Sequence, residues 1–214
     1  VLVTAKNWPQ REKFLEMVQK VLDSVAPRKA YYPGAADRWA KFTGETPKTS
    51  DATLPWKMIR NIDPNKECQH FVEENFCCVF VETSLEAKDE IDFMAKAADF
   101  ATNRLRGTLG CSVMIHPSTR KQAASESAFQ KMLANLHYGS IGVNYWSAMS
   151  YAMMSCPWGG YPGADLKDPV SGIGFVHNTY MFDKPLKSVV MGPISQPMKP
   201  IWFPGNETAY KVTK

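Results

Sequence analysis

The chain has 214 residues, of which 44% are hydrophobic and 21% are charged, and its 25 basic and 21 acidic side chains give a net charge of +4. This length and composition predict one globular domain, with or without a small appendage, that needs no disulfide framework. The charges are scattered and the apolar runs are too short to cross a bilayer, so we expect no nucleic-acid or membrane partner.

The cysteines and the amino terminus bear on the cellular compartment. Five cysteines, an odd number without any Cys-x-x-Cys pair, argue against disulfides and against a zinc site. The four histidines have no metal-ligand spacing, so no metal site is expected. The first residues lack the cationic start and long apolar centre of a signal peptide. The sequence therefore predicts a cytoplasmic protein with reduced thiols.

The first elements in chain order are a strand over residues 1–4 and an amphipathic helix over 10–25, in which apolar residues recur every three or four positions. Residues 27–56 are rich in proline, glycine and polar residues and predict an irregular stretch with one short helix near 35–42. Over residues 56–62, apolar and polar side chains alternate as in a strand.

The middle of the chain alternates apolar runs with helical patterns, which is typical of βαβ units and a parallel sheet. Thr83 and Glu86 have the spacing of a capping box, so a helix is expected to begin there. The expected elements are strand 76–81, helix 83–103, strand 107–115, helix 118–136 and strand 139–146. The predicted fold class is therefore α/β with a parallel sheet, whose ligands collect outside the carboxyl ends of its strands.

The character of the sequence changes after residue 145. A long segment rich in glycine, proline and aromatic residues follows, and such a loop inside a domain is usually functional or disordered. Its aromatic residues argue against disorder. A final strand is predicted over 187–194, before an extended, aromatic tail. A strand and tail of this kind are suited to pairing with the sheet edge of a second subunit.

Taken singly, the short motifs have ordinary structural explanations. Glu73 and Glu74 would be solvated loop residues before a buried strand. The Ser-Gly-Ile-Gly segment at 171–174 lacks the preceding strand and following helix of a phosphate-binding loop. Cys156 has no nearby cation or histidine to stabilise a thiolate, so we expect a residue of a pocket wall, and a thiol nucleophile is the weaker alternative.

Taken together and in order, four segments resemble the carboxyl-terminal half of an aldehyde dehydrogenase. EENFCC (73–78) resembles the family's acidic-acidic-x-Phe-Gly-Pro segment, and GSIGVN (139–144) resembles its Gly-x-x-x-Val-Asn strand. PWGG (157–160) resembles a Pro-Phe-Gly-Gly turn, and SGIG (171–174) a Ser-Gly-x-Gly segment. The resemblance covers most of the chain and is looser before residue 65.

The resemblance implies the parallel-sheet, three-layer αβα catalytic domain of the aldehyde dehydrogenase type in residues 1–184. Residues 185–214 would be an oligomerisation strand and carboxyl-terminal tail that join a homodimer or homotetramer. The enzyme would oxidise an aldehyde to a carboxylic acid with NAD or NADP, through a cysteine thiohemiacetal. The nucleophilic cysteine and the cofactor-binding domain would precede Val1, so we expect this chain alone to hold no catalytic residue, to be inactive and to bind the cofactor weakly.

The resemblance also assigns residues to a site. Glu74 would accept hydrogen bonds from the hydroxyls of the nicotinamide ribose, and Phe76 would lie against the nicotinamide ring. Asn144, Tyr145 and Trp158 would belong to the substrate pocket, where Tyr145 and Trp158 would form walls for the aldehyde. Glu74, Phe76 and Trp158 are expected to point into one shared cleft.

The chain departs from the family pattern at two places. Cys77 and Cys78 stand where the family has Gly-Pro, which removes a fixed φ and changes how the ring of Phe76 is held. Trp158 occupies the position of a phenylalanine in the family, and its larger side chain would narrow the entrance for the substrate. The lack of an initiator methionine favours a piece of a longer enzyme. The alternative is a non-catalytic aldehyde-dehydrogenase-like module used for assembly.

Overall fold

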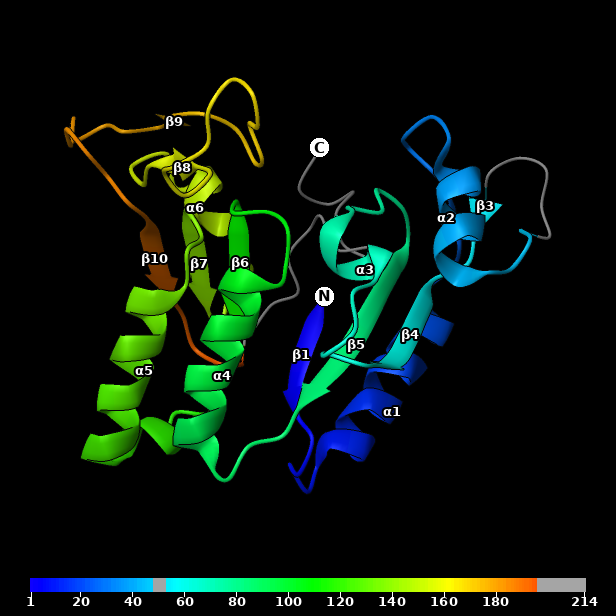
Figure 1. Cartoon of the computed structure of the whole chain (residues 1–214), viewed down its shortest axis with the longest axis horizontal. Coiled ribbons are helices and arrows are strands. Elements are labelled where there is room, and N and C mark those ends of the chain that lie inside the picture. Colours follow the sequence, from blue (N-terminus) through cyan, green and yellow to red (C-terminus); the bar gives the residue numbers. More distant parts are fainter. Residues whose placement is uncertain (48–52, 196–214) are drawn as a thin grey trace, which may run out of the picture. The chain divides into compact units, whose positions relative to one another are not determined.

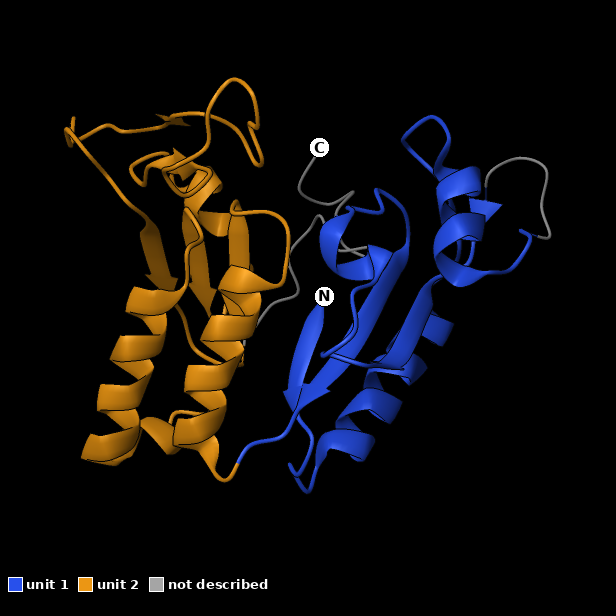
Figure 2. Ribbon diagram, viewed as in Figure 1, with its two compact units in different colours: residues 1–87, 198–214 blue, residues 88–197 orange. Residues whose placement is uncertain are grey.

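The computed structural model describes residues 1–47 and 53–195. The chain divides into two compact units at Ala87 and Lys88 (Figure 2). Unit 1 contains the described residues up to 87, and unit 2 contains those from 88 to 195. Each unit has its own sheet of three parallel strands and is described by itself.

Unit 1 is built on a parallel sheet with the strand order β1-β5-β4 (Figure 1). Leu2 lies opposite Glu82, and Lys57 lies opposite Val79. The elements of this unit are β1 (Leu2–Ala5), α1 (Arg11–Ser24), β2 (Arg28–Lys29), α2 (Ala35–Thr43), β3 (Thr53–Leu54), β4 (Lys57–Ile62), α3 (Gln69–Val72) and β5 (Val79–Leu85). The predicted strand over 1–4, the helices over 10–25 and 35–42 and the strand over 56–62 are all present.

Helix α2 is the anchor of the smaller core in unit 1. It lies between Gly34 and Gly44, which both have a left-handed backbone that glycine adopts without strain. Trp39 and Phe42 are buried on its inner face. They pack in one cluster with Leu54 and Val79, so α2 is fixed against the start of β5.

A buried ion pair joins α1 to the middle strand of unit 1. The side chain of Glu82 is fully buried, and Nη2 of Arg11 donates to its two carboxylate oxygens at 2.7 and 2.8 Å. The Thr4 hydroxyl donates at 2.6 Å and the Asn61 N–H at 3.1 Å. Burial by itself raises the pKa of Glu82, but these hydrogen bonds and the Arg11 charge outweigh it and lower the pKa. An ionised carboxylate therefore connects β1, α1 and β4 at the centre of the sheet.

Strand β5 has different bounds from those predicted. It begins at Val79 rather than at residue 76, and it continues through Thr83, whose hydroxyl donates to Ile62 O at 2.7 Å. The predicted capping box at Thr83 and Glu86 is therefore wrong, because strand pairing outweighs the local helix signal at a buried β-branched residue. Helix α4 begins at Glu90 instead, and the Asp89 carboxylate caps it by accepting Asp92 N–H at 2.8 Å.

Unit 2 has a parallel sheet with the strand order β10-β7-β6. Figure 1 shows α4 and α5 side by side on one face of this sheet. The elements are α4 (Glu90–Asn103), β6 (Gly110–Val113), the 3₁₀ turn η1 (Thr119–Lys121), α5 (Ala123–Asn135), β7 (Ser140–Val143), α6 (Met149–Ala152), β8 (Trp158–Gly159), β9 (Phe175–Val176) and β10 (Ser188–Met191).

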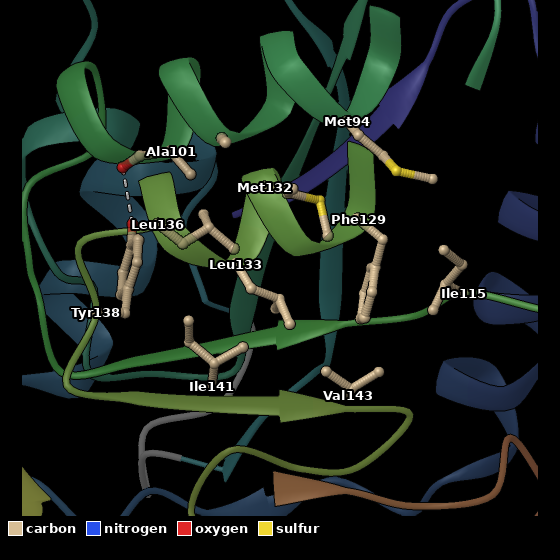
Figure 3. Packing of buried hydrophobic residues seen from close by; sticks show 11 residues of the cluster. Met94, Ala101, Ile115, Phe129, Met132, Leu133, Leu136, Tyr138, Ile141 and Val143 are labelled. Atoms are coloured by element: carbon tan, nitrogen blue, oxygen red, sulfur yellow. Dashed lines mark hydrogen bonds between the residues drawn. The ribbon is translucent and has the colours of Figure 1, made fainter. Parts of the chain in front are cut away.

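The main core of unit 2 lies between these two helices and the sheet (Figure 3). Phe129 and Leu133 of α5 point toward Ile141 and Val143 of β7, and all four are buried. Tyr138 is buried too, and its hydroxyl donates to Ala101 O at 2.8 Å. Strand β7 is buried along its whole length because both of its faces are covered, as expected of a central parallel strand.

The predicted α/β class with parallel sheets is confirmed. The β6–α5–β7 segment is a βαβ unit with parallel strands, as predicted. Strands β5 and β6 belong to different sheets within the described residues, so the single sheet predicted across 76–146 is not formed there. The aldehyde dehydrogenase type, its three layers and the boundary at residue 184 stay predictions.

The predicted final strand is present as β10. It pairs parallel with β7, with Ser188 opposite Ser140, and lies at the edge of the unit 2 sheet. Next to it, the Lys187 ammonium donates to the carbonyls of Leu133, at 2.8 Å, and Leu136, at 2.5 Å, at the end of α5. The tail over 196–214 lies outside the described residues. In the described part of the chain no helix has the length and hydropathy of a membrane span.

Replacing Glu82 by Gln should lower the free energy of unfolding by about 3 kcal/mol at neutral pH, because it leaves the Arg11 charge buried without its partner. The lowered pKa of Glu82 means that the stabilisation is present above the usual value of 4.5 and is lost as the pH falls through the folded-state pKa. The difference between the two proteins should therefore shrink below pH 4.5. Urea unfolding followed by tryptophan fluorescence measures both effects.

Glu45→Gln is the control, because Glu45 forms an exposed ion pair with Lys57 and should contribute less than about 1 kcal/mol. Equal unfolding midpoints for Glu82→Gln and the wild type would contradict the role given to the buried pair.

Candidate functional site

The two neighbouring glutamates of the 73–78 segment have different surroundings. Both are exposed, and Glu73 forms an ion pair with Lys41 of α2 at 2.6 Å. Within the described ranges Glu74 makes no hydrogen bond or ion pair, and both of its oxygens are free to accept from a ligand. Both glutamates are therefore solvated residues before the buried strand, as predicted. Of the two, Glu74 is the one whose carboxylate is not engaged by another described residue.

The backbone turns sharply at Phe76 and presents its ring. Phe76 has a φ of +43°, a left-handed conformation that is strained for an aromatic residue and costs about 1–3 kcal/mol. Arg38 Nε donates to Asn75 O at 3.0 Å, and the Asn75 side chain donates to Val79 O. These contacts hold the turn, and the Phe76 side chain remains about half exposed at 48%. Strain of this kind is common where a side chain must be presented to a ligand.

This turn lies at the amino end of β5, because residues 73–78 precede the strand. The ligands of parallel sheets usually collect at the carboxyl ends of the strands. Asn144 and Tyr145 follow β7 directly and obey that rule, whereas Glu74 and Phe76 do not. Arg38 of α2 holds the turn between Glu74 and Phe76 by donating to Asn75 O.

Asn144 uses its side chain to hold a neighbouring segment. Its Oδ1 accepts the Ile115 N–H at 2.8 Å, and its Nδ2 donates to Ile115 O at 2.9 Å. Its backbone has a φ of +54°, which asparagine tolerates better than most residues. Both ends of the amide are therefore engaged at the ends of β6 and β7, so Asn144 would shape a pocket by fixing this edge of the sheet.

Tyr145 and Trp158 both lie against other parts of unit 2. A Cβ placed on Gly192 would come within 2.0 Å of the Tyr145 ring, so the ring occupies the space that a side chain at 192 would need. Trp158 lies in β8, which pairs antiparallel with β9. The Tyr151 ring meets the Trp158 ring edge-on, with the ring centroids 5.6 Å apart. Both predicted wall residues are partly exposed.

Three of the four segments that carry the resemblance meet in unit 2 at close backbone contacts. A Cβ on Gly139 would lie 1.9 Å from Gly159 O, and a Cβ on Gly159 would lie 2.3 Å from Gly174 O. We call these three residues the glycine contact. Thr108 O supports it by accepting the N–H of Gly139 at 2.8 Å and that of Tyr161 at 3.0 Å. Glycine is needed at 139 and 159 because no side chain fits between the backbones there, whereas Gly174 contributes its carbonyl oxygen.

Cys156 lines an open groove of about 580 Å³ in unit 2. This position agrees with the prediction that Cys156 is a residue of a pocket wall. No histidine that could activate the thiol is among the groove residues. The groove contains none of the five predicted site residues. It is lined by Ser155, Cys156, Pro157, Tyr180, Phe182, Asp183, Lys184, Pro185, Lys187, Ser188 and Val189.

The predicted site residues fall in both units. Glu74 and Phe76 belong to unit 1, whereas Asn144, Tyr145 and Trp158 belong to unit 2. The structure brings the first two together in one turn. Asn144 and Tyr145 follow the carboxyl end of β7, whereas β8, which carries Trp158, contacts Gly139 at the amino end of the same strand. The convergence of Glu74, Phe76 and Trp158 on one cleft stays a prediction. No group of three or more His, Cys, Asp or Glu side chains in the described part is arranged to hold a metal ion.

Glu74 and Phe76 offer a ligand a hydrogen-bond acceptor and an apolar ring surface. A carboxylate is an acceptor only and can take hydrogen bonds from two neighbouring hydroxyls, as on a ribose. A partly exposed aromatic ring offers an apolar surface to a flat heterocycle. Because Glu74 has no described intramolecular partner and Phe76 is half exposed, both groups are available to a ligand.

Sequence reasoning missed Tyr32, which contacts the Phe76 ring from the turn before α2, and Arg38, which contacts the adjacent backbone from α2. No motif marks them, because their contacts join residues about 40 positions apart. A scan of the chain against protein-family models gave no match, and searches of curated proteins and of solved structures gave none either.

Gly139→Ala should destabilise unit 2 by about 3 kcal/mol or more, because the new methyl group would overlap Gly159 O. Gly174→Asn is the control: its φ of +78° suits asparagine, and a Cβ there meets nothing within 4 Å. Urea unfolding of both variants measures the difference. Wild-type stability of Gly139→Ala would show that the glycine contact is not needed.

Proposed function

We propose that this chain is the carboxyl-terminal part of the catalytic domain of an NAD(P)-dependent aldehyde dehydrogenase. The complete enzyme would oxidise an aldehyde, with water, to a carboxylic acid. The observation that carries the proposal is the strained turn that presents an unpartnered carboxylate, Glu74, two residues from a half-exposed ring, Phe76. The glycine contact supports it, because three resembling segments far apart in the sequence depend on one another for packing.

In this proposal each residue has a separate task. Glu74 accepts hydrogen bonds from two ribose hydroxyls, and Phe76 lies against the nicotinamide ring. Tyr145 and Trp158 supply apolar walls that exclude water from the aldehyde, and Asn144 fixes the edge of the sheet next to Tyr145. The bound cofactor supplies the acceptor for the hydride that the aldehyde loses. The nucleophilic cysteine would come from a segment before Val1, so this chain alone would not turn over substrate.

A second candidate function is a non-catalytic module of the same fold that serves in assembly. The observation in its favour is β10, which pairs with β7 on one side and forms an edge of the unit 2 sheet among the described strands. An edge strand offers backbone groups to a strand of another subunit. Self-association of the complete gene product without any oxidation of aldehydes would favour this second function.

Glu74→Gln in the enzyme encoded by the complete gene should raise the KM for NAD or NADP roughly 10-fold or more, because the hydrogen bonds to the ribose lose their charged acceptor. Steady-state kinetics at saturating aldehyde measure this. Glu73→Gln is a matched control, since Glu73 is adjacent but pairs with Lys41, and its KM should change less than about twofold. Equal KM values for the two variants would contradict the role of Glu74, and a complete product unable to oxidise aldehydes would contradict the proposal.

A further inference from the structure

Two tyrosines in the turn before α2 form a row of aromatic ring contacts with Phe76. The rings of Tyr32 and Phe76 meet edge-on, with centroids 5.3 Å apart and an interplanar angle of 75°. Tyr31 meets Tyr32 in the same manner at 5.2 Å and 87°. Pairs with this geometry attract one another beyond the effect of burial alone. Tyr32 therefore restricts the orientation of the Phe76 ring, whereas Tyr31, which is 90% exposed, contacts only Tyr32 among the described aromatic rings.

Helix α2 holds the backbone of the turn at Phe76. Arg38 lies in α2, six residues after Tyr32, and its Nε donates to Asn75 O at 3.0 Å. Helix α2 is itself fixed in the core by Trp39 and Phe42, which are 3% and 4% exposed. Tyr32, in the turn before α2, thus contacts the Phe76 ring, and Arg38, in α2 itself, holds the adjacent backbone.

The turn needs such support because its own sequence provides little. Cys77 and Cys78 follow Phe76, and a cysteine does not restrict its own backbone φ as a proline at the same position would. The positive φ of Phe76 is unfavourable, so without outside contacts the turn would relax to a more common conformation. The contacts from α2 compensate for that strain.

We propose that Tyr32 and Arg38 are positioning residues that hold the Phe76 ring in the orientation in which it receives the nicotinamide ring. This inference rests on the proposed function of Phe76. Tyr32 and Arg38 act through Phe76 and its backbone, and neither is required to touch the cofactor.

The first test observes the Phe76 ring directly and needs no cofactor. In the chain with isotope-labelled phenylalanine rings, the Phe76 signals, assigned with Phe76→Leu, should show an NOE to the Tyr32 ring. Tyr32→Leu should abolish the ring-current shift of Phe76, Tyr32→Phe should keep it, and Tyr31→Leu is the matched control that should also keep it. Tyr32 is 50% exposed, so these variants are expected to fold.

The second test measures cofactor use in the enzyme from the complete gene. Tyr32→Leu should raise the KM for NAD or NADP roughly 3- to 10-fold, the equivalent of losing one edge-to-face pair. The KM for the aldehyde should not change, whereas general loss of structure would affect both. Tyr32→Phe and Tyr31→Leu should stay within about twofold of the wild type.

A Phe76 spectrum that is the same in Tyr32→Leu and the wild type would overturn the inference. So would an altered spectrum with an unchanged cofactor KM, provided that Glu74→Gln raises that KM. If neither Glu74→Gln nor Tyr32→Leu affects the cofactor KM, the proposed function has failed, and with it the positioning role. The spectrum would then report only whether Tyr32 orders the ring.

Discussion

The arrangement of unit 2 depends on a backbone contact that leaves no room for a side chain. The carbonyl of Gly159 lies where a Cβ of residue 139 would be, and the carbonyl of Gly174 lies where a Cβ of residue 159 would be. Through these contacts, the segment leading into the buried strand β7 fixes the β8–β9 hairpin, which carries Trp158. Residues that are 35 positions apart in the chain are thereby held in one place, and the lack of space for a Cβ explains the glycines at 139 and 159.

Much of the fold could be predicted because its signals are local. The helical spacing of apolar residues indicated α1 directly, and the alternation of apolar runs with helical patterns indicated the β6–α5–β7 unit. The capping-box pattern at Thr83 was misleading, because sheet pairing buried that residue. The Arg11–Glu82 pair could not be foreseen, since residues 71 positions apart meet only when β5 enters the sheet. A charged residue at the start of an amphipathic helix ordinarily indicates a solvated face.

The candidate site divides in the same manner. The exposed pair Glu74 and Phe76 was indicated by a short pattern, and the structure adds the reason for the presentation of the ring, a strained turn supported by Arg38. The contact of Tyr32 with Phe76 bridges 44 positions and has no sequence signature. Asn144 was expected to belong to the substrate pocket, and the structure adds that its amide binds both backbone groups of Ile115. Short motifs thus selected the candidate residues, while long-range packing decided what each one contacts.

If the chain is one part of a larger aldehyde dehydrogenase, its parent polypeptide must carry a nucleophilic cysteine ahead of the first residue seen here. Mass spectrometry of the native polypeptide, captured from its source cells with an antibody against this chain, decides this most directly. The predicted result is a mass well above 24.0 kDa, with a cysteine-containing segment before Val1. A native polypeptide that starts at or near Val1 would contradict it.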